Sequence, residues 1–296
     1  MEFRRKVHIG AGVAVLAVLV AGGGWWLERS EAPAGGLAGG VAGEAREGGL
    51  SLALAPAVRD VAVTEARVPG RPLVVIDPGH GGRDPGASGA GQGTRESDLT
   101  LLIARELRTR LAERGRVRIA LTRDGDHTLT LDDRASIARR LGADLFLSIH
   151  ADSAANPEAT GATAYSLSEV ASDKDAARFA SAQNGSEGAI TSVADGSVRA
   201  LLADLAVRDE MNASADFAMR VIGKASGRVE LRPEPHRFAA FRVLRGAEAP
   251  AVLFEAGYLS NAEDEARLLD PAHRRRLVEA LADAVEAELA VRSARR

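Results

Sequence analysis

Residues 73–80 read LVVIDPGH, an apolar run that ends at a histidine within a glycine-containing turn. Two later stretches have the same form, since residues 145–150 read LFLSIH and residues 251–255 read AVLFE. Each run is predicted to be an interior strand, because short continuous apolar runs are typical of strands buried on both faces. In open α/β sheets, ligands bind at the carboxyl ends of the strands. The two histidines and the glutamate that end these runs are therefore expected to meet in one catalytic metal site.

The chain between residues 72 and 292 alternates predicted strands with predicted helices. Apolar residues at helical spacing predict helices over 97–112, 131–141, 204–223 and 270–292, and further strands are expected over 117–122 and 162–167. Repeated alternation of strands and helices is typical of a parallel sheet with helices on both faces. The predicted fold is a single α/β domain with a mostly parallel, twisted sheet flanked by helices.

Composition excludes several classes of protein and site. The 296 residues are 46% hydrophobic and 27% charged, which is typical of a globular core with a solvated surface. The formal charge of −3 and the lack of a basic stripe argue against a nucleic-acid partner. No cysteine is present, so disulfides and cysteine-ligated zinc are excluded, and any metal must use His, Asp or Glu.

The N-terminal segment has the form of an export signal. Three basic residues, Arg4, Arg5 and Lys6, precede an apolar stretch over residues 7–27, which is long enough to span a bilayer. Residues 1–27 are therefore expected to be a signal peptide or an N-terminal membrane anchor, and the length favours an uncleaved anchor. The Gly/Ala/Glu-rich segment 28–71 is expected to be a flexible linker, with the folded domain starting near residue 72.

The residues at the predicted strand ends suggest zinc chemistry. The glycine-rich turn around His80 could by itself cradle a phosphate, and a lone histidine in a turn is often structural. Glu96, directly before a predicted helix, and His150 change this interpretation, because two histidines and a glutamate with an open fourth position form a catalytic zinc arrangement. Glu255, at the end of a buried strand, suits the role of general base, although it could instead cap a neighbouring helix.

Four motifs together resemble the zinc-dependent N-acetylmuramoyl-L-alanine amidases of the cell-separation (AmiC-like) type. They are residues 75–82, Glu96 before its leucine-rich helix, residues 145–152 and residues 252–261, and the resemblance spans residues 72–289. It implies that His80, Glu96 and His150 bind Zn²⁺ and that Glu255 is the catalytic acid/base. It also implies a periplasmic enzyme that cleaves the amide between N-acetylmuramic acid and L-alanine in peptidoglycan during wall remodelling and daughter-cell separation.

The resemblance also suggests a regulatory insertion over the active site. Residues 168–202 are polar and rich in Ala, Ser and Asp, and their position matches a segment that covers the zinc in cell-separation amidases. There, a glutamate reaches the metal until an activator protein with a degenerate metallopeptidase-like domain displaces the segment. In this chain Gln183 occupies the expected glutamate position, so inhibition is weaker, Glu187 substitutes for it, or the blocking is steric.

Two other functions are compatible with the same residues. A zinc peptidase that cuts within the stem peptide would use the same strand-end metal geometry. A wall-binding protein without catalytic activity would bind peptidoglycan but would not turn it over. The presence of all four polar residues, His80, Glu96, His150 and Glu255, favours the amidase over the non-catalytic protein.

Overall fold

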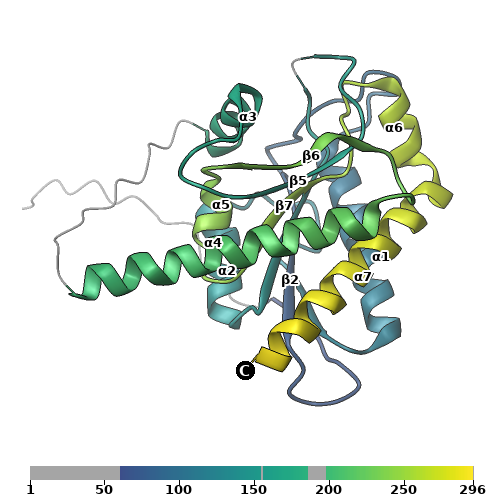
Figure 1. Cartoon of the computed structure of the whole chain (residues 1–296). Helices are drawn as coiled ribbons and strands as arrows, with labels where there is room; N and C mark the ends of the chain where they lie inside the picture. The colour runs from purple at the N-terminus through teal and green to yellow at the C-terminus, as the bar shows by residue number, and fades with distance from the viewer. Residues whose placement is uncertain (1–60, 155, 186–197, 296) are drawn as a thin grey trace, which may run out of the picture. The chain divides into compact units, whose positions relative to one another are not determined.

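The computed structural model describes residues 61–154, 156–185 and 198–295 (Figure 1). These residues form a seven-stranded sheet. Its strands are β1 Val63–Thr64, β2 Leu73–Pro78, β3 Arg118–Leu121, β4 Leu145–His150, β5 Ala162–Leu167, β6 Leu231–Ala239 and β7 Ala251–Glu255. The strand order is β1-β3-β2-β4-β7-β5-β6. The three runs that suggested a metal site are therefore adjacent central strands.

Most of the strand pairs are parallel, as the sequence predicted. β2 pairs in parallel with β3 and β4, β4 pairs in parallel with β7, and β5 pairs in parallel with β6. The antiparallel pairs are β1 with β3 and β5 with β7. The expected α/β fold with a mostly parallel sheet is confirmed.

Seven helices accompany the sheet in the described part of the chain. They are α1 Glu96–Arg114, α2 Leu131–Leu141, α3 Lys174–Asn184, α4 Val198–Ala225, α5 Arg242–Arg245, α6 Ala262–Leu269 and α7 Pro271–Arg295. Figure 1 shows α4 and α7 crossing one face of the sheet.

The two faces of the sheet bury different sets of side chains. Alternate residues of a strand point to opposite faces. Val74, Leu147 and Val252 pack against α1, α4 and α7, whereas Val75 and Leu253 pack against α2 and α5 on the other face, with α3 at its edge. The continuous apolar runs of the central strands follow from this two-sided burial.

Local signals explain why the helices begin and end where they do. Thr130 and Asp133 form a capping box at the start of α2, and Gly142, at a φ of 62°, ends it in the left-handed conformation. Asn261 caps α6 by accepting hydrogen bonds from two backbone N–H groups. These residues fix helix boundaries independently of tertiary contacts.

The structure differs from the sequence prediction at three places. Val63 and Thr64 fall in the expected linker but form β1, which pairs with β3, so the folded part begins before residue 72. α4 begins at Val198, inside the expected insertion. The elements β6, α3, α5 and α6 were not predicted.

The N-terminal predictions concern residues that the structure does not describe. The expected signal or anchor, residues 1–27, and most of the expected linker lie outside the described residues. Of the helices in the described part, none combines the length and apolarity needed to cross a membrane.

Candidate functional site

Two of the polar residues predicted from the sequence, His150 and Glu255, lie on one face of the sheet at the ends of neighbouring strands. His150 of β4 is directly opposite Glu255 of β7, which is in turn opposite Thr163 of β5. One step down the same face, Asp77 of β2 is opposite Ser148 of β4. This row of residues places His150 and Glu255 side by side, as the strand-end argument required.

His80 lies in a strained turn just beyond β2. Its φ is 57°, in the left-handed region that non-glycine residues rarely occupy. Arg134 of α2 holds this turn: its guanidinium donates at 2.7 Å to the carbonyls of both Pro78 and His80. Donors that hold the carbonyls on both sides of Gly79 can maintain a backbone conformation that is unfavourable on its own.

A buried ion pair fixes Arg134. Its Nη1 lies 2.7 Å from Asp77 Oδ1, and Asp77 also accepts hydrogen bonds from Thr122 and Ser148. Burial alone would raise the pKa of Asp77, but the Arg134 charge and these hydrogen bonds hold it below its usual value. Asp77 is therefore an ionised structural residue, and it supports the His80 turn through its ion pair with Arg134.

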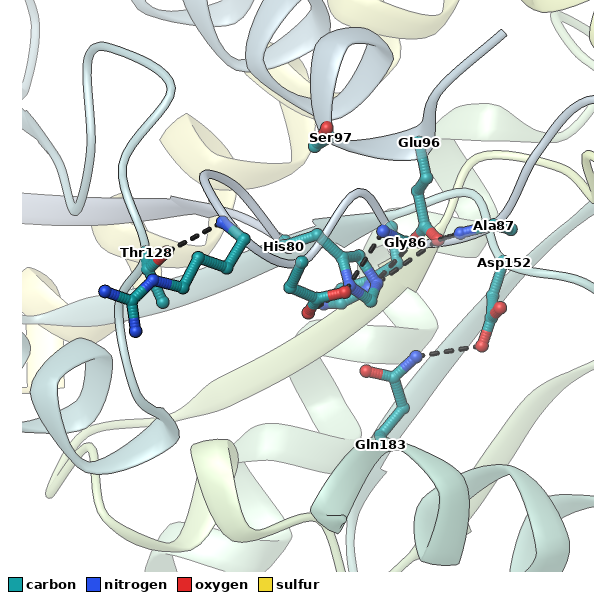
Figure 2. A network of polar contacts seen from close by, with 12 residues as sticks. His80, Gly86, Ala87, Glu96, Ser97, Thr128, Asp152 and Gln183 are labelled. Atoms are coloured by element: carbon teal, nitrogen blue, oxygen red, sulfur yellow. Dashed lines mark hydrogen bonds and ion pairs between the residues drawn. The ribbon is translucent and has the colours of Figure 1, made fainter. Parts of the chain in front are cut away.

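His80, Glu96 and His150 bring their ligand atoms within 4.8 Å of one another. Figure 2 shows the side chains of His80 and Glu96 meeting in this cluster. His80 Nε2 lies 3.2 Å from one Glu96 oxygen, and His150 Nδ1 lies 3.2 Å from the other. His80 Nε2 is buried, and Glu96 Oε2 is its close polar neighbour. Two imidazole nitrogens and a carboxylate that face one another form a donor set suited to a divalent metal ion.

Backbone and side-chain contacts orient these candidate ligands. His80 Nδ1 lies 2.8 Å from Asp84 Oδ2, which fixes the ring with Nε2 facing the cluster. Each Glu96 oxygen accepts a backbone hydrogen bond at 2.9 Å, one from Ala87 and one from Ala151. These contacts orient the three side chains toward one another, and the three residues could hold a metal ion.

The electrostatics of the cluster favour a cation. Burial lowers the pKa of His80, but hydrogen bonding and charge interaction with Glu96 and Asp84 outweigh it and raise the pKa to about 9. Burial likewise raises the pKa of Glu96, but hydrogen bonds from His150 and His80 bring it well below its usual value. The site stabilises positive charge at His80, which either a proton or a metal ion can supply.

Two glycines leave room for the cluster. A Cβ at Gly79 would overlap the imidazole ring of His150. A Cβ at Gly86, whose φ is 68°, would lie 2.6 Å from Glu96 Oε2 and 2.8 Å from His80 Cδ2. The glycine-rich turn thus serves to let the backbone approach the ligand candidates closely.

Glu255 is fully buried beside this cluster. Its Oε2 accepts a hydrogen bond from the Asp152 backbone N–H at 2.9 Å, and its Oε1 has no hydrogen-bond partner. Burial and the negative charges of Glu96 and Asp152 raise its pKa well above the usual value for glutamate. A carboxyl group with one fixed and one unpaired oxygen is suited to proton transfer.

A cavity of about 670 Å³ opens beside the cluster and is bounded by α3. Its lining includes His80, His150, Asp152 and Gln183. Figure 2 shows Gln183 on α3 pointing at Asp152, to which its amide nitrogen donates at 2.9 Å. Gln183 therefore contacts the residue next to Glu255 rather than the metal-ligand candidates.

The neighbouring asparagine also fixes the end of α3. The Asn184 amide donates to the Ala240 carbonyl at 2.8 Å, and its oxygen accepts from the Arg242 backbone N–H at 2.8 Å. The other predicted regulatory residue, Glu187, lies outside the described residues.

Sequence reasoning missed Asp84, Asp152, Arg123 and Arg134 as parts of this site. The two aspartates had a usable signal, because each follows a candidate ligand histidine within four residues. The two arginines had no such signal. Their guanidinium groups donate to the carbonyls of the His80 turn from α2 and from just after β3, which are distant in sequence.

Comparison with known proteins agrees with this geometry. A family model described as N-acetylmuramoyl-L-alanine amidase matches residues 74–287. The N-acetylmuramoyl-L-alanine amidase AmiA of Escherichia coli is 35% identical over 220 residues, which cover 73% of this chain and 75% of AmiA.

Two solved structures have a similar fold. The catalytic domain of the amidase CwlV from Bacillus (Paenibacillus) polymyxa is 28% identical with a TM-score of 0.54, covering 74% of this chain and 99% of that one. The amidase AmiC2 of Nostoc punctiforme is 28% identical with a TM-score of 0.53, covering 77% of this chain and 99% of AmiC2. The expected enzyme class is confirmed: this chain belongs to the N-acetylmuramoyl-L-alanine amidase family and is a cell-wall hydrolase of the cell-separation type.

Proposed function

We propose that this amidase is a zinc enzyme in which His80, Glu96 and His150 hold Zn²⁺ and Glu255 is the acid/base. The observation that carries the proposal is the cluster of His80, Glu96 and His150, whose ligand atoms lie within 4.8 Å of one another. Beside this cluster, Glu255 is fully buried and its Oε1 has no hydrogen-bond partner. The donor set of two imidazoles and one carboxylate is typical of catalytic zinc sites that keep a fourth position open. The reaction is hydrolysis of the amide between N-acetylmuramic acid and L-alanine in peptidoglycan.

The protein's own groups account for the proton movements. Zinc, when bound, supplies Lewis acidity toward the scissile carbonyl and toward water. Glu255 Oε1 then accepts the proton of the attacking water and returns it to the leaving amine nitrogen. The Asp152 N–H on Oε2 keeps the unpaired oxygen in place, and the raised pKa lets the carboxyl hold the proton between the two transfers.

The test uses the full chain on labelled peptidoglycan. We expect solubilisation that stops with a chelator and returns with Zn²⁺, and metal analysis should find one zinc per chain. Mass spectrometry of the fragments should find intact stem peptides with a free N-terminal alanine, whereas a peptidase would leave shortened peptides. Chelator-insensitive cleavage would contradict the zinc assignment.

We also propose that α3 and the segment around it, residues 168–202, hold the enzyme in a resting state. Support comes from the position of α3 at the cavity and from the Gln183 contact with Asp152. Because Gln183 is neutral and contacts Asp152, the blocking is steric. An activator protein that displaces α3, such as one with a degenerate metallopeptidase-like domain, would open the site, and Glu187→Gln should leave basal activity unchanged.

Finally, we propose a periplasmic location, with residues 1–27 as signal or inner-membrane anchor, a linker up to about residue 60 and the catalytic domain after it. Support comes from the basic and apolar N-terminal pattern. Fractionation of cells that produce the full chain tests it: an anchored enzyme stays with the membrane, and a cleaved one appears in the soluble periplasmic fraction. Recovery in the cytoplasm would contradict the proposal.

A further inference from the structure

Two arginines lie on the Glu255 face of the sheet, on the side away from His150. Arg237 of β6 is directly opposite Tyr165 of β5, which is opposite Leu253 of β7. Since alternate residues share a face, Arg237 lies on the same face as Glu255, two residues beyond Leu253. β6 is two strands from β7, or about 10 Å at the usual strand spacing.

Arg232 approaches Glu255 through a chain of hydroxyl groups. Thr163, the strand neighbour of Glu255, lies 3.2 Å from the Tyr258 hydroxyl, and Arg232 Nη1 donates to that hydroxyl at 3.0 Å. The guanidinium also lies over the Tyr258 ring, 5.3 Å from its centroid. Arg232 is thus held in a fixed orientation close to the proposed acid/base.

Both arginines pair with acidic residues of one helix, and Arg237 also has an unpaired nitrogen. Arg237 is only 9% exposed, yet its Nε is buried without a hydrogen-bond partner. Its ionic partner is Asp173, at 3.2 Å, and Arg232 lies 3.8 Å from Asp175. Both aspartates belong to the start of α3, the helix whose other end carries Gln183.

We infer that Arg232, Arg237 and the Tyr258 hydroxyl form a binding subsite for a carboxylate of the stem peptide, and that Asp173 and Asp175 occupy it in this structure. The inference rests on the proposed function. Stem peptides carry free carboxylates near the scissile amide, and guanidinium groups held in place are well suited to bind them. α3 then spans the site, with its first turn in the carboxylate subsite and Gln183 at Asp152.

The test compares two stem peptides that differ only in whether the second residue carries a free carboxylate or an amide. Calorimetry on the full chain measures binding and needs no turnover. We expect the carboxylate peptide to bind about tenfold more tightly than the amide peptide. In Arg232→Gln and in Arg237→Gln, the affinities for the two peptides should become more nearly equal. Arg245→Gln, which removes an arginine paired with Glu169 elsewhere on the surface, should keep the preference.

A second variant tests whether α3 occupies the carboxylate subsite, without unfolding α3. Asp173 caps α3 by accepting from two backbone N–H groups, and asparagine caps a helix equally well. Asp173→Asn should therefore keep α3 folded, remove the competing charge at Arg237 and tighten binding of the carboxylate peptide several-fold, with little change for the amide.

Equal binding of the two peptides, in both the wild type and Asp173→Asn, would overturn the inference. It would also be overturned if both arginine variants melted like the wild type and kept its preference for the carboxylate peptide. Parallel hydrolysis assays on peptidoglycan keep the two proposals separate. Carboxylate preference without any zinc-dependent cleavage would support the subsite and contradict the proposed function.

Discussion

The His80 turn and α3 border the same cavity but are held in different ways. The carbonyls of Pro78, Gly79 and His80 all accept hydrogen bonds from Arg123 and Arg134, which are 2% and 4% exposed. α3 buries two alanines, packs the half-buried ring of Phe179 against Tyr165 and Phe241, and has its C-terminal end fixed by side-chain amides. The metal side is preorganised by buried charges at considerable electrostatic cost, whereas α3 is attached by one half-buried aromatic ring and by polar contacts at its two ends.

Removing the carboxylate between the two histidines should have the largest effect. Glu96→Gln keeps the size of the side chain but takes away the charge that both imidazoles face. We expect zinc affinity to fall more than about 100-fold, since outer partners of metal ligands alone are typically worth about 10–100-fold. Calorimetric zinc titration checks this, with Asp98→Asn, an exposed acid in the same helix turn, as the control. An unchanged affinity would remove Glu96 from the ligand set.

Breaking the buried ion pair behind the His80 turn should cost stability as well as zinc affinity. Arg134→Met leaves Asp77 charged in the core without its ion-pair partner and removes the arginine from the His80 carbonyl. We expect a loss of about 3–5 kcal/mol in the free energy of unfolding, measured with urea. Arg139→Met, on the exposed side of α2, should change it by about 0.5 kcal/mol or less. Similar losses in both variants would show that the pair has no special role.

A matched pair of glycines separates backbone strain from crowding of the site. Gly86 and Gly93 have φ values of 68° and 69°, but a Cβ meets Glu96 and His80 only at Gly86, and meets nothing within 4 Å at Gly93. Each change to alanine should cost about 1–2 kcal/mol of stability. Only Gly86→Ala should also weaken zinc binding, and equal zinc affinities in the two variants would contradict the crowding argument.

The smallest expected effect is on the α3 side. Gln183→Ala removes one hydrogen bond, worth about 1 kcal/mol, from the closed position of α3. We expect basal release of labelled peptidoglycan to rise up to about fivefold, with a nearly unchanged melting temperature. Arg178→Ala, on the exposed side of the same helix, is the control. A fall in activity would mean that Gln183 assists the reaction instead of restraining it.

The sequence predicted elements with strong local signals and missed those without them. β2, β4 and β7 are continuous apolar runs, and α2 has its own capping residues, so their boundaries followed from local signals. β6 was missed because Pro233 and Pro235 interrupt it and several of its side chains are exposed, features that argue against a strand. α3 was missed because its polar, alanine-rich sequence resembles a loop.

In the site, the residues that do chemistry were predictable and those that hold them were not. His80, His150 and Glu255 end apolar runs, and parallel pairing brings such ends together. The hydrogen bond from Arg134 to the His80 carbonyl, by contrast, joins residues far apart in the chain. No local sequence pattern encodes such a tertiary contact. The Gln183 position was predicted from a resemblance, but its partner, Asp152, required the structure.

In the proposed mechanism, three residues hold the metal while a fourth, Glu255, transfers the proton. Zinc content and turnover measured together on Glu255→Gln test it most directly. We predict one zinc per chain, as in the wild type, with turnover reduced about 100- to 10,000-fold. Loss of the zinc, or turnover equal to that of the wild type, would contradict the claim.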